Sequence, residues 1–238
     1  MTEKSCNICD NYSEVTERVQ RACEKVGRNP DTVRIMAVTK TIDSARIAQA
    51  ITCGIDLIGE NKVQELLQKK DELSETFKPE IHFIGGLQSN KVKHIVGLVD
   101  LIQSVDSAKL ASEIDRLSKL RGVTTDILIQ VNIAGESTKN GIAPDKLEEL
   151  IESVSSLENI RLRGLMAIPP FGDSVKYFPK MQQLFEDLKN LKPSESLGER
   201  FGERFNMLSM GMSGDYEKAI EYGSTLVRLG TALFGNRI

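Results

Sequence analysis

Eight short apolar runs, separated by amphipathic segments, dominate this sequence. Each run is rich in Val, Ile and Leu and has the length of one buried β-strand. The runs are Val33–Val38, Ile55–Ile58, Ile81–Ile84, Leu101–Val105, Ile127–Ile133, Ile160–Ile168, Phe205–Met210 and Leu226–Leu229. Apolar strands that alternate with helices are typical of parallel sheets covered on both faces. This alternation constrains the fold more than any other feature of the chain.

The segments between the runs carry helical patterns. An opening helix is expected at about residues 11–26, ahead of the first strand. A later stripe at i, i+3, i+4 and i+7 spacing consists of Leu147, Leu150, Ile151, Val154 and Leu157. Residues that favour helix N-termini stand near three expected helix starts: Asp43, Ser107 and Asp145.

Eight strand–helix repeats in 238 residues fit a (β/α)8 TIM barrel, whose typical size is about 250 residues. The competing architecture is a doubly wound open sheet, which would usually carry a Gly-rich phosphate loop after its first strand. The segment 38–43, Val-Thr-Lys-Thr-Ile-Asp, is not such a loop. No Pro/Gly/Ser-rich linker divides the chain. We therefore predict an α/β protein with a flexible N-terminus at 1–10 and one barrel domain at 11–238.

Composition and charge exclude several classes of function. The net charge is -3 and charges of both signs are interspersed, so neither a nucleic acid nor an anionic membrane surface is an expected partner. No apolar stretch approaches the roughly 20 residues that span a bilayer. The N-terminus lacks the apolar core of a secretory signal. We expect a cytoplasmic protein.

The N-terminal cysteines have the spacing of a redox or metal-binding motif, Cys6-x-x-Cys9. No second cysteine pair or histidine pair completes a zinc site, so no metal is expected. The motif also precedes every strand, unlike a thioredoxin-like motif. We interpret these residues as incidental thiols on a frayed end of the chain.

Lys40 follows the first strand at its C-terminal end, where α/β folds gather their reactive groups. Partial burial there lowers the pKa of a lysine, and its neutral amine can then attack a carbonyl group. A Schiff-base lysine is therefore a hypothesis to test. Most lysines beyond a strand are solvated surface residues, and that alternative stays open at this point.

The ends of the last two strands carry the features of a phosphate site. Ser213 lies ahead of an expected helix at 216–222, and Gly230 and Thr231 follow the eighth strand. The loops after strands seven and eight form the recurring phosphate site of TIM barrels, although an N-cap and a turn would use the same residues. Alternation along the eighth strand places Arg228 either inside the barrel or on its outer surface. A lysine, a phosphate site and an inward arginine match the needs of pyridoxal 5′-phosphate.

Motifs along nearly the whole chain resemble the pyridoxal phosphate homeostasis protein family. They include Ala37-Val-Thr-Lys40, Gly59-Glu-Asn-Lys-Val-Gln-Glu65, His82-Phe-Ile-Gly85, Leu87-Gln-Ser-Asn-Lys91, Gly164-Leu-Met-Ala-Ile-Pro169, Leu208-Ser-Met-Gly-Met-Ser213 and Val227-Arg-Leu-Gly-Thr-Ala-Leu-Phe-Gly235. Such proteins are similar to the barrel domain of alanine racemases, with an N-terminal helix and without the racemases' β-domain. One departure is Gly86, where family members more often have a bulkier residue.

The resemblance implies a set of cofactor-binding residues: Lys40, Asn61, Ser213, Arg228, Gly230 and Thr231. In that arrangement Lys40 holds pyridoxal phosphate as a Schiff base, Arg228 faces the pyridine nitrogen, and Asn61 lies near the ring. Ser213, Gly230 and Thr231 hold the phosphate. Lys139 is a candidate for a second contact with the cofactor, although a solvated loop lysine is the more common explanation for such a residue.

The resemblance further implies a role in intracellular pyridoxal phosphate homeostasis, by storage, buffering or delivery of the cofactor, without catalytic residues. The expected partners are pyridoxal phosphate, other vitamin B6 vitamers and apo-enzymes that depend on the cofactor, and the expected state is a monomer. A weak amino-acid racemase or related enzyme is the alternative function. A phosphate-binding barrel without cofactor is a third possibility.

Overall fold

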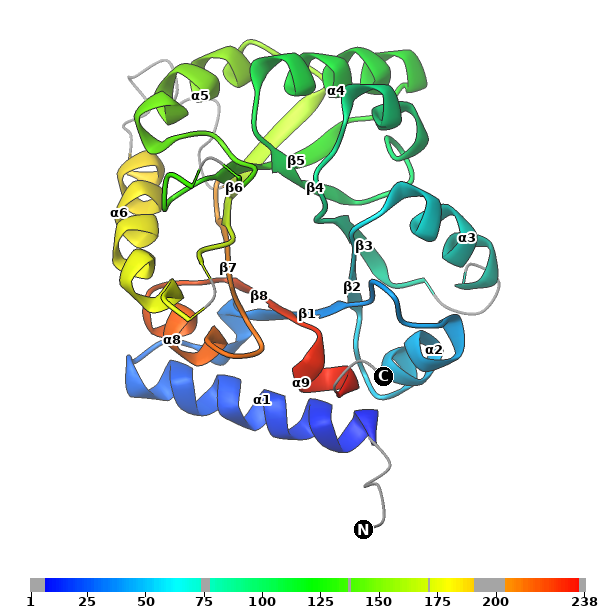
Figure 1. Ribbon diagram of the computed structural model, residues 1–238, viewed down its shortest axis with the longest axis vertical. Coiled ribbons are helices and arrows are strands. Elements are labelled where there is room, and N and C mark those ends of the chain that lie inside the picture. The colour runs from blue at the N-terminus through cyan, green and yellow to red at the C-terminus, as the bar shows by residue number, and fades with distance from the viewer. Residues whose placement is uncertain (1–6, 74–77, 137, 171, 191–203, 236–238) are drawn as a thin grey trace.

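The computed structural model describes residues 7–73, 78–136, 138–170, 172–190 and 204–235. Eight parallel strands form a closed barrel in sequence order, and β8 pairs with β1 to complete it (Figure 1). The strands are β1 (Arg34–Val38), β2 (Leu57–Glu60), β3 (Glu80–Phe83), β4 (Leu101–Val105), β5 (Thr125–Val131), β6 (Ile160–Ala167), β7 (Met207–Met212) and β8 (Leu226–Leu229). The predicted TIM barrel is confirmed, and each expected strand is present within about two residues of its expected limits.

Helices surround the barrel. In the described residues they are α1 (Ile8–Lys25), α2 (Ser44–Thr52), α3 (Val63–Leu73), α4 (Ala108–Arg121), α5 (Leu147–Ser155), α6 (Phe178–Lys189), α8 (Tyr216–Glu221) and α9 (Thr231–Phe234), with short 3-10 helices η1 (Pro30–Thr32), η2 (Ser89–His94), η3 (Pro144–Lys146) and η4 (Ser174–Tyr177). Asp43 and Ser107 cap α2 and α4 as predicted, whereas Asp145 lies within η3 and caps no helix. None of these helices has the length and hydropathy needed to cross a membrane.

Apolar side chains fill the space between strands and helices, because each strand turns alternate residues outward. Two small apolar clusters are separate from this packing. One consists of Met36, Val38, Leu57, Ile84 and Leu226, and the other of Leu101, Leu128 and Met166. Polar side chains inside the barrel form hydrogen bonds between strands, such as those between Gln103, Ser209 and Arg228.

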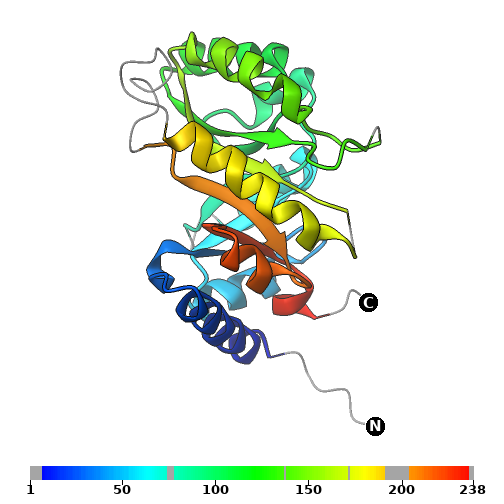
Figure 2. The same ribbon diagram turned by 90° about the vertical axis from the view of Figure 1, so that its left-hand side faces the viewer.

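The N-terminal helix begins earlier than expected. Asn7 caps α1, its side chain accepting a hydrogen bond from the Cys9 amide at 3.1 Å, so residues 8–10 are helical. Residues 1–6, and with them Cys6, lie outside the described residues. α1 runs along the outside of the barrel beside α8 and α9 (Figure 2).

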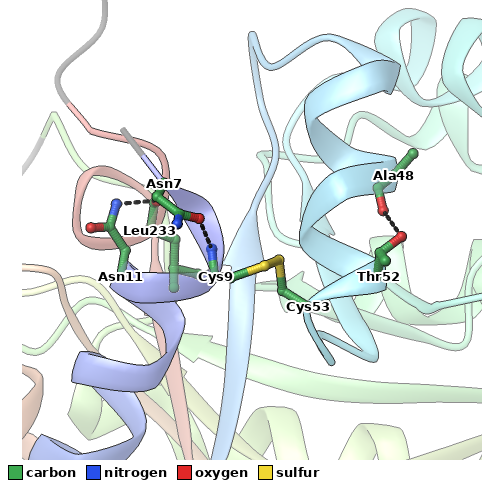
Figure 3. The surroundings of a disulfide bond; sticks show 7 residues. All are labelled: Asn7, Cys9, Asn11, Ala48, Thr52, Cys53 and Leu233. Carbon is green, nitrogen blue, oxygen red and sulfur yellow. Dashed lines mark hydrogen bonds between the residues drawn. A yellow bond between two sulfur atoms is a disulfide. The ribbon is translucent and has the colours of Figure 1, made fainter. Parts of the chain in front are cut away.

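Cys9 forms a disulfide bond with Cys53, at the C-terminal end of α2 (Figure 3). The interpretation of Cys9 as an incidental thiol on a frayed end is therefore wrong. The pairing depends on how α1 docks against α2, which brings the two Cα atoms to 5.1 Å across 44 residues of sequence. That distance lies within the range that disulfide bonds require.

Reduction of this disulfide is expected to lower the stability of the fold. In the chain-entropy model, opening a loop of 44 residues costs about 4 kcal/mol. For a chain of this length that loss corresponds to a fall in Tm of about 10 °C. Thermal unfolding with and without reductant measures the effect. As a control, reductant should not change the Tm of a Cys9→Ser protein, and an equal Tm for oxidised and reduced wild-type protein would contradict the prediction.

Candidate functional site

A cavity of about 510 Å³ opens at the C-terminal ends of the strands. Its volume lies within the range of small-molecule sites. All six residues that the sequence resemblance implied line this cavity: Lys40, Asn61, Ser213, Arg228, Gly230 and Thr231. Other residues that line it are Val38, Ile84, Ile168, Gly172, Ser174, Val175, Met212, Gly214 and Asp215. The fold thus brings together residues from both halves of the chain.

Lys40 and Asn61 come from the first two strands. Lys40 lies two residues beyond the end of β1 and is half-buried, while Asn61 directly follows β2. The strands β1 and β2 are parallel neighbours, with Val38 opposite Gly59. Their C-terminal ends therefore place an amine and an amide beside each other at the mouth of the barrel.

Ser213 joins the loop after β7 to the loop after β8. Its hydroxyl oxygen accepts hydrogen bonds from the backbone amides of Gly230, at 3.2 Å, and Ala232, at 3.1 Å. A serine hydroxyl still has one proton to donate when its oxygen accepts. Within the part of the chain that the structure describes, no acceptor for that proton is recorded. A ligand phosphate oxygen in the cavity fits this donor, and Thr231, which also has a hydroxyl, lines the same cavity.

Arg228 points into the barrel, as one of the two open alternatives predicted. It is 4% exposed, and its two terminal nitrogens donate to Ser209 Oγ at 2.6 Å and to the Ala167 carbonyl at 2.7 Å. Burial lowers the pKa of Arg228 to about 10, and the nearby Asp215 carboxylate acts in the opposite direction. The guanidinium remains charged at neutral pH, and it presents a buried cation to any anionic or hydrogen-bond-accepting ligand in the cavity.

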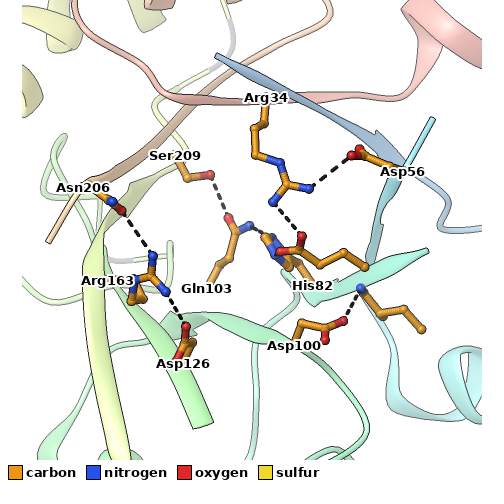
Figure 4. A network of polar contacts seen from close by, with 11 residues as sticks. Arg34, Asp56, His82, Asp100, Gln103, Asp126, Arg163, Asn206 and Ser209 are labelled. Carbon is orange, nitrogen blue, oxygen red and sulfur yellow. Dashed lines mark hydrogen bonds and ion pairs between the residues drawn. The ribbon is translucent and has the colours of Figure 1, made fainter. Parts of the chain in front are cut away.

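A chain of hydrogen bonds runs from Arg228 across the barrel interior. Figure 4 shows the part of this chain from Ser209 through Gln103 to His82. Ser209 accepts from Arg228 and donates to Gln103 Oε1 at 2.7 Å, and Gln103 Nε2 faces His82 Nδ1 at 2.9 Å. A guanidinium only donates, which fixes the direction of every later bond. His82 Nδ1 is then the acceptor of this bond, and the other ring nitrogen of His82 is Nε2. This Nε2 lies 2.6 Å from Glu80 Oε1.

The chain ends at an ion pair near the N-terminal ends of the strands. Arg34 contacts Glu80 at 2.7 Å, and its other terminal nitrogen lies 3.7 Å from Asp56. The hydrogen bond from His82, together with Arg34, lowers the pKa of Glu80 to about 2 although burial opposes the shift. A carboxyl group whose pKa is lower in the folded than in the unfolded protein stabilises the fold at pH values above its ordinary pKa. This contribution is therefore lost as pH falls from about 4.5 towards 2.

Replacing Gln103 with leucine is expected to destabilise the protein. The change leaves the Ser209 hydroxyl without its acceptor and His82 Nδ1 without its donor, in a fully buried setting. Each buried unsatisfied group costs about 1–3 kcal/mol. Chemical denaturation measures the loss. Gln68→Leu, on an exposed position of α3, is the matched control and should change stability by less than about 0.5 kcal/mol. Equal stability of the two variants would contradict the prediction.

Sequence reasoning missed Ser209 as a partner of Arg228, and Gln103 as the partner of Ser209. Their polar character at inward positions of otherwise apolar strands was the available signal. His82 is fully buried and both ring nitrogens have partners, so it is a structural residue of the barrel interior. Lys139 is exposed in the loop after β5 and does not line the cavity, which favours the solvated alternative.

Comparison with known proteins places the chain in a family. The alanine racemase N-terminal domain model matches residues 11–237. A pyridoxal phosphate homeostasis protein of Aquifex aeolicus is 41% identical, and the match covers 97% of this chain and 99% of that protein. The chain belongs to the pyridoxal phosphate homeostasis protein family.

Solved structures agree with this assignment. PipY of Synechococcus elongatus, solved with pyridoxal phosphate bound, is 32% identical with a TM-score of 0.76, and the match covers 92% of this chain and all of that one (100%). Alanine racemase of Clostridium difficile is 17% identical with a TM-score of 0.70, which shows a shared fold. This pyridoxal phosphate homeostasis family member matches 57% of the racemase chain, so it corresponds to the barrel part of that enzyme.

Proposed function

We propose that this protein binds pyridoxal 5′-phosphate in the barrel-mouth cavity and serves to store, buffer or deliver the cofactor. One observation carries the proposal: a lysine, a buried arginine and a serine that joins two loops converge on one cavity of about 510 Å³. The chemistry of these donors fits an aldehyde that also carries a phosphate and a pyridine nitrogen. The cofactor bound to PipY supports the same assignment.

Each lining residue has a role that follows from its own chemistry. When bound, the cofactor supplies an aldehyde that condenses reversibly with amines. Lys40 would hold the cofactor through its Nζ amine, with release of one water. The hydroxyls of Ser213 and Thr231 would hold the phosphate beside Gly230, whose amide already donates to Ser213, and Asn61 would border the ring.

Arg228 argues against efficient catalysis. Because a guanidinium only donates hydrogen bonds, a pyridine nitrogen held by Arg228 would accept and would stay unprotonated. An unprotonated ring is a weaker electron sink than a pyridinium. The reversible attachment to Lys40 would then serve mainly to release the cofactor to another protein or amine. Apo-enzymes and other vitamin B6 vitamers are the proposed partners, a monomer is the proposed state, and the cytoplasm is the proposed location.

The competing function is a weak racemase or related enzyme. Racemisation needs an acid–base group on each face of the substrate carbon. Lys40 supplies one, and Asp215 is the only carboxylate among the described residues that line the cavity. Its Oδ1 accepts the Met212 amide at 2.6 Å, which ties it to the loop. Exchange of amino-acid α-protons into deuterated water at about 1 per second or faster would favour the enzyme.

Borohydride reduction of the loaded protein tests the binding proposal. Reduction converts a C=N bond into a stable secondary amine, and mass spectrometry of the digested protein then identifies the modified lysine. We expect one cofactor per chain on Lys40. A modification only at other lysines, or none, would overturn the proposal. Transfer of unreduced cofactor to an apo-enzyme, followed by the activity it gains, tests the delivery role.

A further inference from the structure

The turn that carries Lys40 has an unusual backbone. Thr41 has φ of 64°, and it is the one non-glycine residue with positive φ in the described part of the chain. This conformation is unfavourable for a β-branched residue. Such conformations persist where the surroundings hold them, and they concentrate at functional sites. Contacts with neighbouring residues must therefore hold Thr41 in this conformation.

An ionic cluster lies directly behind the turn. Lys69 of α3 is 7% exposed, and its Nζ donates to the Thr39 carbonyl at 2.6 Å, to Glu60 Oε1 at 2.9 Å and to Glu65 Oε1 at 2.6 Å. These three contacts use all three protons of the ammonium group. Glu60, the last residue of β2, is fully buried, and its Oε1 also accepts from the Thr39 hydroxyl at 2.6 Å.

The cluster holds both peptide groups that flank Lys40. The Thr39 carbonyl belongs to the peptide before Lys40 and accepts from Lys69. The Thr41 amide belongs to the peptide after Lys40 and donates to Glu65 Oε1. Fixing both peptide planes fixes φ and ψ of Lys40. The direction in which the lysine side chain leaves the backbone is therefore set by residues on β2 and α3.

Stability alone does not account for this cluster. Buried ion pairs often contribute no more than apolar residues of the same volume, because removing charges from water is costly. Burial would raise the pKa of Glu65, but hydrogen bonds from Lys69 and from the Thr41 amide outweigh it and lower that pKa. Glu65 thus stays ionised at neutral pH and continues to accept the hydrogen bond from the Thr41 amide.

We propose that Lys69, Glu60 and Glu65 are positioning residues that aim Lys40 at the aldehyde carbon of the cofactor. The inference rests on the proposed function of the cavity. Lys69 itself does not line the cavity, and it acts only through the backbone of the turn. Misplacement of a reacting atom by about 1 Å can slow a reaction by about 100-fold.

The test separates aiming from binding. Pyridoxine 5′-phosphate has the ring and phosphate but an alcohol in place of the aldehyde, so it reports on the cavity without Lys40 chemistry. The main variant is Glu60→Gln with Lys69→Met, which removes both charges and leaves no lone buried ion; Glu65→Gln is the second variant. Lys70→Met, at the next and exposed position of α3, is the matched control.

We expect the rate of C=N formation with pyridoxal phosphate, followed by absorbance, to fall by about 10- to 100-fold in both variants. Affinity for pyridoxine 5′-phosphate should change less than about threefold, and the control should match wild type. Equal losses in rate and affinity would show a merely structural cluster and overturn the inference, as would an unchanged rate. Failure of the wild-type protein to form the C=N bond would instead overturn the proposed function, and the inference with it.

Discussion

Replacing Lys40 with alanine is expected to abolish covalent attachment of pyridoxal phosphate while the barrel stays folded. Lys40 lies beyond β1 and outside the apolar clusters, so the change removes the amine without opening a cavity in the core. A ligand at 100 times its Kd stabilises a protein by about 2.7 kcal/mol. The cofactor should therefore raise the wild-type Tm by about 5–10 °C, and this rise should largely disappear in the variant.

Absorbance of the C=N bond and mass after borohydride reduction measure the attachment, and thermal unfolding measures the stabilisation. Lys139→Ala is the matched control, because Lys139 is exposed and does not line the cavity. It should behave as wild type in both measurements. A Lys40→Ala protein that still forms one stable adduct per chain would show that another lysine holds the cofactor.

The strands could be predicted because those of a closed parallel barrel are covered on both faces and read as apolar runs. Their limits depend on contacts that no local pattern reveals. β2 extends to Glu60, a charged residue, because Glu60 pairs with Phe83 of β3, and Lys69 of α3 compensates its buried charge. Phe205 was expected to open β7, but it lies before the strand and stacks on Phe185 of α6 at 5.2 Å between ring centroids.

The positions of the site residues were also predictable, since barrel topology gathers the C-terminal strand ends at one mouth. The partners of those residues were not. Ser209 and Gln103 are 106 residues apart, and only the closed barrel brings them to hydrogen-bond distance. The same limit applies to Cys9 and Cys53, whose pairing follows from the docking of α1 rather than from the spacing of cysteines.

Replacing Gly85 with alanine is expected to damage both the fold and the site. A Cβ atom there would lie 1.9 Å from the carbonyl oxygen of Asn61 and 2.7 Å from its carbonyl carbon. Both are backbone atoms that directly follow β2, so no side-chain rotation relieves the clash. Overpacking typically costs about 1–3 kcal/mol, and a backbone clash lies at or above the upper end of this range. Denaturant unfolding measures this cost.

The neighbouring Gly86 provides a control that differs only in what the added methyl group meets. A Cβ on Gly86 would lie 2.7 Å from Nδ2 of Asn140, the far end of an exposed and flexible side chain that can rotate away. Gly86→Ala should therefore cost less than about 1 kcal/mol. Because Gly85→Ala displaces Asn61 at the cavity, it should also weaken cofactor binding by about tenfold or more. If the two variants had equal stability and affinity, the close contact between Gly85 and Asn61 would not control the shape of the mouth.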